Sequence, residues 1–257
     1  MAKTVSLIGL ESFPIIKPGD NLAELIVTTS QREGVALNDR DVVVVAHKVL
    51  SKAEGRIVRL SDIKPSKKAE VTAKATSRDS RFIELIMKET KSIFKATREI
   101  LIVENRQGWV CINAGVDKSN VEGEDAYTLL PKDPDKSARW IRSEIMKLTG
   151  KKVAVIITDT YSRPFRRGQV EFAIGLAGIN AFRDYRGQKD LFGHVLKVKN
   201  TAVADEVASA AELIMGQGVE SVPVVIIKNL GGVKLRENVS SADLLISRDE
   251  DLFKDTL

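Results

Sequence analysis

Residues 152–169 read KVAVIITDTYSRPFRRGQ and change within a few positions from an uncharged apolar run to a polar loop. The apolar half, residues 153–157, is mostly β-branched, which predicts a strand buried on both faces of a sheet. We expect the polar residues that follow to lie at the carboxyl end of this core strand. There, side chains can converge on a ligand without disturbing the hydrogen bonds of the sheet.

The polar half of this segment combines residue types that bind cations and phosphate. Asp159 stands between Thr158 and Thr160 and offers carboxylate oxygen, a ligand that hard divalent cations prefer. Three arginines follow, whose planar guanidinium groups match phosphate oxygens in pairs: Arg163, Arg166 and Arg167. The segment indicates a metal and phosphate site. In the alternative interpretation, Asp159 caps a helix and the arginines cover a solvated surface or pair with carboxylates.

Further apolar runs predict the other secondary-structure elements. A first strand is expected at residues 5–10, a buried strand at 41–46, a last core strand at 222–228, and a hairpin at 100–103 and 109–112. Helical spacing predicts helices from an Asp20 cap to near Gly34, two within 64–91, one at 136–148 that ends at Gly150, and one at 204–215. We interpret 172–182 as a buried interface or core helix, 185–193 as an exposed loop or hairpin, and Leu244 with Leu245 as the start of a last helix.

The mixture of strand types with irregularly placed helices favours an α+β fold with mixed sheets over a doubly wound sheet. The whole chain, residues 1–257, is expected to form one unit. A possible internal boundary lies near residues 131–136, in the polar linker PKDPDKS.

Three more loops carry residues suited to a ligand. The prolines of FPIIKPGD hold residues 13–17 in an exposed, stiff apolar loop, whose side chains stack on a flat ring or plug into the core. His47, Lys48 and Lys52 follow the strand at 41–46 and are placed to meet phosphate or a base, although a lone histidine carries little information. Residues 113–125 crowd small polar groups, including Asp117 and Asn120, into a cation-binding loop or an ordinary Asx-rich turn.

Composition narrows the function classes. A net charge of +5 is too small and too dispersed for a dedicated nucleic-acid binder. The single cysteine, Cys111, has apolar neighbours and fits a buried hydrophobe rather than a nucleophile. No apolar stretch reaches the roughly 18 residues of a membrane span, and the amino terminus lacks a secretion signal. We therefore expect a cytoplasmic protein without nucleic-acid or membrane partners.

Taken in order, seven segments resemble the archaeal F420 γ-glutamyl ligase family. They are GLESFPIIKPGD, VLSKAEGRI, CINAGVDKSNVEGED, VIITDTYSRPFRRG, KDLFG, VADEVASAAELIMGQG and VPVVIIK. The likeness extends from about Leu10 to Lys228. Runs such as NAGVDKSN and ITDT-x-x-R-x-F-R-R-G are far more specific than any single short motif.

The resemblance implies a GTP-dependent ligase that adds L-glutamate to coenzyme F420-0. The coenzyme carboxylate is first phosphorylated by GTP, and the glutamate amine then displaces phosphate, so that one or more γ-linked glutamates are added. The resemblance also implies two divalent cations, Mn2+ or Mg2+, stimulation by K+, and an intertwined homodimer of two-domain α+β subunits.

The family's functional positions carry over residue by residue. Asp117 and Asp159 match the ligands of one metal, and Thr160 and Gln217 those of a second. The two aspartates and Lys52 are the expected catalytic residues, and the three arginines are tentative substrate contacts. The positions that match GTP contacts are Phe13, Pro14, Ile15, Ile16, His47, Lys48, Lys52, Asn120, Met215, Gly216, Gln217, Gly218, Val219, Glu220, Ser221 and Val222.

Two departures from the family pattern bear on these roles. A member of the family has glutamate where Gln217 stands, so this chain has less negative charge at the second metal. Ser-Thr stands there in place of His47 and Lys48, which alters the contacts with base or phosphate. Rival hypotheses are a non-catalytic nucleotide-binding module, an RNA-associated protein, and a ligase of the same chemistry with another carboxylate or amine.

Overall fold

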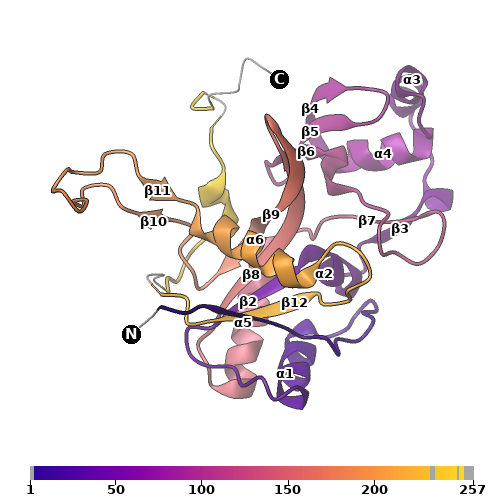
Figure 1. Cartoon of the computed structure of the whole chain (residues 1–257). Helices are drawn as coiled ribbons and strands as arrows, with labels where there is room; N and C mark the ends of the chain where they lie inside the picture. Colours follow the sequence, from indigo (N-terminus) through magenta and orange to yellow (C-terminus); the bar gives the residue numbers. More distant parts are fainter. Residues whose placement is uncertain (1–2, 232–234, 248, 252–257) are drawn as a thin grey trace.

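The computed structural model describes residues 3–231, 235–247 and 249–251, and its centre is a five-stranded sheet with the order β1-β12-β2-β8-β9 (Figure 1). β2 and β8 are parallel, and the other neighbours are antiparallel. The bounds are Ser6–Gly9 for β1, Val42–Ala46 for β2, Ala154–Arg163 for β8, Arg166–Ala177 for β9 and Val224–Lys228 for β12. The predicted core strands and the α+β class with mixed sheets are confirmed.

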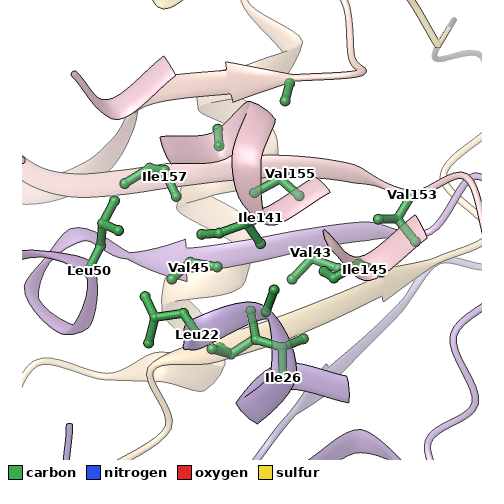
Figure 2. Packing of buried hydrophobic residues seen from close by; sticks show 14 of the residues in the cluster. Leu22, Ile26, Val43, Val45, Leu50, Ile141, Ile145, Val153, Val155 and Ile157 are labelled. Carbon is green, nitrogen blue, oxygen red and sulfur yellow. The ribbon is translucent and has the colours of Figure 1, made fainter. Parts of the chain in front are cut away.

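Helices cover both faces of this sheet, which explains why its central strands lack polar alternation. On one face α1 (Leu22–Arg32) and α5 (Pro134–Thr149) pack against Val43, Val45, Val155 and Ile157 (Figure 2). On the other face α6 (Val203–Met215) packs against Val42, Val44, Ala154 and Ile156. No helix in the described part of the chain is long and apolar enough to cross a membrane.

The ends of these helices follow local capping chemistry, but the predicted capping residue of α1 is wrong. Asn21, rather than Asp20, caps α1, because its side-chain oxygen accepts a hydrogen bond from Glu24 N at 3.2 Å. The Asp20 carboxylate instead accepts from Lys17 N at 2.7 Å. At the end of α5, Gly150 adopts the left-handed conformation, as the sequence predicts.

The prediction of a helix at residues 172–182 is wrong, because these residues continue β9 as far as Ala177. The sequence of an apolar run does not distinguish a strand buried on both faces from a core helix. Here the run forms a strand because it pairs with β8. The predicted close backbone packing is present. A Cβ atom on Gly175 would lie 2.6 Å from the carbonyl oxygen of Pro134, at the start of α5.

Residues between α2 (His47–Ala53) and α5 build a second lobe with its own apolar cluster (Figure 1). The lobe contains η1 (Leu60–Asp62), α3 (Lys67–Thr76), α4 (Ser80–Glu89), β4 (Thr90–Ala96), β5 (Leu101–Asn105), β6 (Val110–Ile112) and η2 (Asn113–Gly115). The antiparallel pair of β3 (Ile57–Arg59) and β7 (Ala126–Thr128) connects it to the central sheet. The two predicted helices and the hairpin are confirmed, whereas β4 was not predicted.

Three surface segments complete the fold. Of the three large apolar side chains in the predicted exposed loop, Ile15 is exposed (87%), whereas Phe13 and Ile16 join the core. The arm between β10 (Arg183–Asp184) and β11 (Asn200–Thr201) extends from the body and carries the predicted exposed loop (Figure 1). A short 3-10 turn, η3 (Ser241–Leu244), ends where a helix was expected to begin, so that prediction is wrong.

Candidate active site

Parallel pairing of β2 with β8 places the carboxyl end of β2 beside the middle of β8, with Ala46 opposite Thr158. The expectation that the polar residues after Ile157 lie at the end of this strand is therefore wrong, because β8 continues to Arg163. α2 begins at the next residue, His47, and Asp159 follows Thr158. His47 Nε2 consequently lies 3.0 Å from Asp159 Oδ1, and both side chains are largely buried. The Asp159 carboxylate also accepts from Thr160 N at 2.8 Å. The helix-cap alternative for Asp159 is wrong, since β8 continues through it as a strand.

The second aspartate is held by the next residue of the same helix. Lys48 Nζ lies 2.6 Å from Asp117 Oδ2, and the backbone N of Ser119 donates to Asp117 Oδ1 at 2.9 Å. Burial raises the pKa of Asp117, but the hydrogen bonds from Lys48 and Ser119 outweigh it and leave the pKa below its ordinary value. Consecutive residues of α2 therefore contact the two aspartates that the sequence places in one site.

A group of oxygen atoms lies beside Asp159 on the β8–β9 pair. Thr160 is opposite Glu171, and the Glu171 carboxylate accepts hydrogen bonds from the hydroxyls of Thr158 and Thr160. Gln217, after α6, donates from Nε2 to Glu171 Oε1 at 3.1 Å, and its Oε1 lies 3.2 Å from Thr160 Oγ1. The structure thus brings Thr160 and Gln217 together, as the family resemblance of the sequence implies.

Glu171 was missed by sequence reasoning. Its one signal is an acidic residue between Val170 and Phe172 in an otherwise apolar run. Burial raises the pKa of this carboxyl, and the negative charge of Asp159 acts in the same direction, against the hydrogen bonds from Thr158 and Thr160.

Burial and the charge of Asp159 also raise the pKa of two neighbouring side chains, Cys111 and Tyr161. Burial, followed by the charge of Asp159, raises the pKa of the Cys111 thiol to about 12. The same two causes, in the same order, raise the pKa of Tyr161 well above its ordinary value. Cys111 is thus the buried, unreactive thiol that the sequence predicts.

The loop after α6 closes on the Asp117 segment. Asn120 Nδ2 donates to the carbonyl oxygen of Gly218 at 3.3 Å, which joins two of the predicted nucleotide-binding segments. Gly216 has φ +64°, and a Cβ there would collide with the Glu220 side chain, which accepts from Gly218 N at 2.8 Å. The loop is therefore held in a compact turn, with Val219 exposed on it.

The amino-terminal segment reaches the same region. A Cβ on Gly9 would lie 2.6 Å from a methyl carbon of Val222, and Leu10 N donates to Val224 O at 3.0 Å. The start of the loop that holds Ile15 is therefore adjacent to the end of the loop after α6.

Lys52 lies one helical turn beyond Lys48 on α2 and is half-buried. Burial lowers its pKa, and the neighbouring positive charge of Lys48 lowers it further. Within the described part of the chain, Lys52 forms no ion pair. Its ammonium group is consequently available to a ligand.

The three arginines lie at the turn between β8 and β9. Arg163 ends β8 and Arg166 begins β9, so the predicted loop is only a tight hairpin turn of Pro164 and Phe165. Arg163 donates to the carbonyl oxygen of Arg167 at 3.2 Å. The hairpin presents the arginines at its tip, and within the described residues none of them forms a salt bridge with a carboxylate.

The donor set fits a hard cation. Among the described residues no three histidine, cysteine or acidic side chains are placed so that they could hold a metal ion together, so a metal would also need hydroxyl, amide or ligand oxygens. Thr160 and Gln217 provide such oxygens beside Glu171, and Asp117 and Asp159 provide carboxylates nearby in the fold.

Comparison with known proteins gives one family. The family described as F420-0:Gamma-glutamyl ligase matches residues 11–229. The chain is 42% identical over 250 residues to the coenzyme F420:L-glutamate ligase of Methanothermobacter thermautotrophicus, covering 97% of this chain and 99% of that protein. It is 44% identical over 254 residues to the protein of the same name from Methanocaldococcus jannaschii, with 98% of each chain covered. With the Methanopyrus kandleri protein of that name, the identity is 46% over 216 residues, 84% of this chain and 83% of the relative.

Proposed function

The chain belongs to the F420-0:gamma-glutamyl ligase family, and we propose that it adds L-glutamate to coenzyme F420-0 with GTP as the phosphoryl donor. Ligation of glutamate in F420 biosynthesis is the activity that the names of the family and its relatives describe. The dependence on GTP and the route through an acyl phosphate are the finer parts of the proposal.

A carboxylate and an amine do not condense in water, so the reaction needs an activated acyl group. A carboxylate oxygen of the coenzyme attacks the γ-phosphorus of GTP, the bond to the bridging oxygen breaks, and GDP leaves. The glutamate amine then attacks the acyl carbon and loses a proton as the amide bond forms. The C–O bond breaks and inorganic phosphate leaves with the bonding electrons.

One observation carries this proposal: His47 and Lys48, consecutive residues of α2, contact Asp159 and Asp117 respectively. Phosphoryl transfer depends mainly on positioning and on neutralising charge. A short helix that fixes both carboxylates sets the geometry of the site in the folded chain. Lys52, on the same helix, adds a positive charge toward the transferred phosphoryl group.

Two divalent ions, Mn2+ or Mg2+, are part of the proposal. Asp117 and Asp159 would hold one, and Thr160 and Gln217 the other. When bound, such ions offset the negative charge of the triphosphate. The nucleotide would be bound by segments 13–16 and 215–222 together with His47, Lys48 and Asn120. Ile15 is exposed and is suited to contact with a flat ring.

The arginines of the β8–β9 hairpin are proposed to bind the phosphate or carboxylates of the coenzyme, since guanidinium groups pair with such oxygens. The same family likeness supports a homodimer, stimulation by K+ and a cytoplasmic location as further parts of the proposal.

The test is turnover of the purified protein with F420-0, L-glutamate, GTP and Mn2+. GDP release and the mass of the coenzyme product are followed together. We expect a gain of one or more glutamyl units that is lost without metal. GDP release that occurs only with a different acceptor would mean that the substrate is not F420-0. Tight GTP binding without GDP release would contradict the proposed ligase activity.

A further inference from the structure

Glu171 occupies a position that the family's metal and nucleotide assignments above leave without a role. It lies on β9 opposite Thr160, and only 6% of it is exposed. Its carboxylate accepts from the hydroxyls of Thr158 and Thr160 and from Gln217 Nε2. All three donors are neutral.

The charge of Glu171 has no counterpart in the protein. Within the described residues, no lysine, arginine or histidine forms an ion pair with it. Asp159, close to it on β8, is another acid, and the basic side chain that Asp159 contacts is His47. Burying a carboxylate without a cation costs several kcal/mol, and neutral hydrogen bonds offset only part of that cost. The site is therefore short of positive charge.

The oxygen atoms around Glu171 are arranged as a cation would need them. The Thr160 hydroxyl lies within hydrogen-bond distance of both Glu171 Oε1 and Gln217 Oε1. Glu171 Oε1 also accepts from Gln217 Nε2, which is a neutral donor. Three oxygens of three different side chains thus lie together, an arrangement that a cation satisfies by contacting all three oxygens.

The residues of the cluster differ in exposure. Thr158 and Glu171 are buried at its base, whereas Gln217 is exposed on the loop after α6. An ion can therefore enter from solvent past Gln217, while the carboxylate stays at the bottom of the site.

We propose that Glu171 is the anionic ligand of the second cation site. Its carboxylate lies beside Thr160 and supplies the negative charge that the neutral amide of Gln217 lacks. The inference rests on the two-metal site of the proposed function and adds a residue to it. In this chain the second cation is held by a carboxylate from β9, and the amide of Gln217 contributes an oxygen from the rim.

The experiment counts the ions bound by the intact protein with Mn2+ alone, using the electron paramagnetic resonance signal of free Mn2+. We expect two sites in the natural protein and a loss of affinity at one of them of about 10- to 100-fold in Glu171→Gln. Glu206→Gln, on the exposed side of α6, is the matched control and keeps both sites. Equal binding by Glu171→Gln and the natural protein would overturn the assignment of Glu171 alone. Absence of Mn2+ binding by the natural protein would overturn the two-metal site as well.

A second variant keeps the test informative if Glu171→Gln folds poorly. Gln217→Glu changes an exposed residue and places a second carboxylate on the same oxygen cluster. Two adjacent carboxylates repel each other without a cation, so Mn2+ is expected to raise the melting temperature of Gln217→Glu more than that of the natural protein. An equal rise for both proteins would contradict a cation site at Glu171 and Gln217.

Discussion

His47 Nε2 lies 3.0 Å from Asp159 Oδ1, although His47 begins α2 and Asp159 lies within β8, more than 100 residues later. The contact exists because β2 and β8 are adjacent and parallel and because α2 begins without an intervening loop. It holds one of the two carboxylates in place before any ligand arrives, and the following predictions start from it.

Asp159→Asn is expected to lower kcat of the proposed reaction by roughly 100-fold or more, because it removes a charge from the proposed metal site while preserving the size of the side chain. GDP release measures the effect, and circular dichroism checks the fold. Asp62→Asn, at an exposed position of η1, is the control and should keep full activity. Full activity of Asp159→Asn would remove Asp159 from the mechanism.

Lys48→Met is expected to raise the pKa of Asp117, because it removes the first of the hydrogen bonds that oppose the effect of burial. A lowered carboxyl pKa stabilises the fold above the unfolded value of about 4. That contribution is lost as the pH falls through the folded value. Since Asp117 is 42% exposed in its side chain, the variant should lose only about 0.2–1 kcal/mol at pH 7.

Urea unfolding of Lys48→Met and the natural protein at pH 7 and near pH 3 measures this difference. The loss should shrink at the lower pH. A destabilisation of equal size at both pH values would mean that Lys48 acts through packing rather than through the charge of Asp117.

Cys111 should resist thiol reagents in the native protein. With a pKa of about 12, its thiolate fraction at pH 8 is roughly 1 in 10⁴, compared with about one quarter for an ordinary thiol. Labelling by a chromogenic disulfide should therefore be about 10³-fold slower in the native state than in urea. Labelling at the same rate in both states would contradict the buried, protonated thiol.

Alanine substitutions at Ile15 and Ile16 should affect different properties, GTP binding at Ile15 and stability at Ile16. Ile16 is 5% exposed and packs in the core, so Ile16→Ala should reduce the free energy of unfolding by about 2–5 kcal/mol. Ile15 is 87% exposed, and Ile15→Ala should change it by less than about 0.5 kcal/mol. Ile15→Ala should instead weaken GTP binding, measured by calorimetry. Unchanged GTP affinity would remove Ile15 from the nucleotide site.

Gly175→Ala should destabilise the protein by about 1–3 kcal/mol, because the added methyl group would lie 2.6 Å from the Pro134 backbone. Thermal unfolding measures this cost. Gly231→Ala is the matched control, since no atom of the described residues other than its chain neighbours lies within 4 Å of the added methyl group there. Equal melting temperatures would show that α5 moves away from β9 at no cost.

The sequence predicts most of the fold from local patterns. The β-branched runs at 41–46 and 222–228 specify core strands through composition alone, and Gly150 ends α5 because it accepts a left-handed conformation. The α+β class follows from the irregular order of these elements. The motifs around Asp117 and Asp159 also identify the family, since runs of that length are far more specific than single residues.

Only the tertiary structure decides which residues meet. The apolar run at 172–182 suits a core helix and a strand equally, and pairing with β8 selects the strand. That pairing places Glu171 opposite Thr160, and parallel strands place His47 beside Asp159. These contacts join residues distant in sequence, so no local pattern encodes them. The sequence alone determined most of the elements and the chemical groups of the site, whereas the strand pairing determined which of these groups come together.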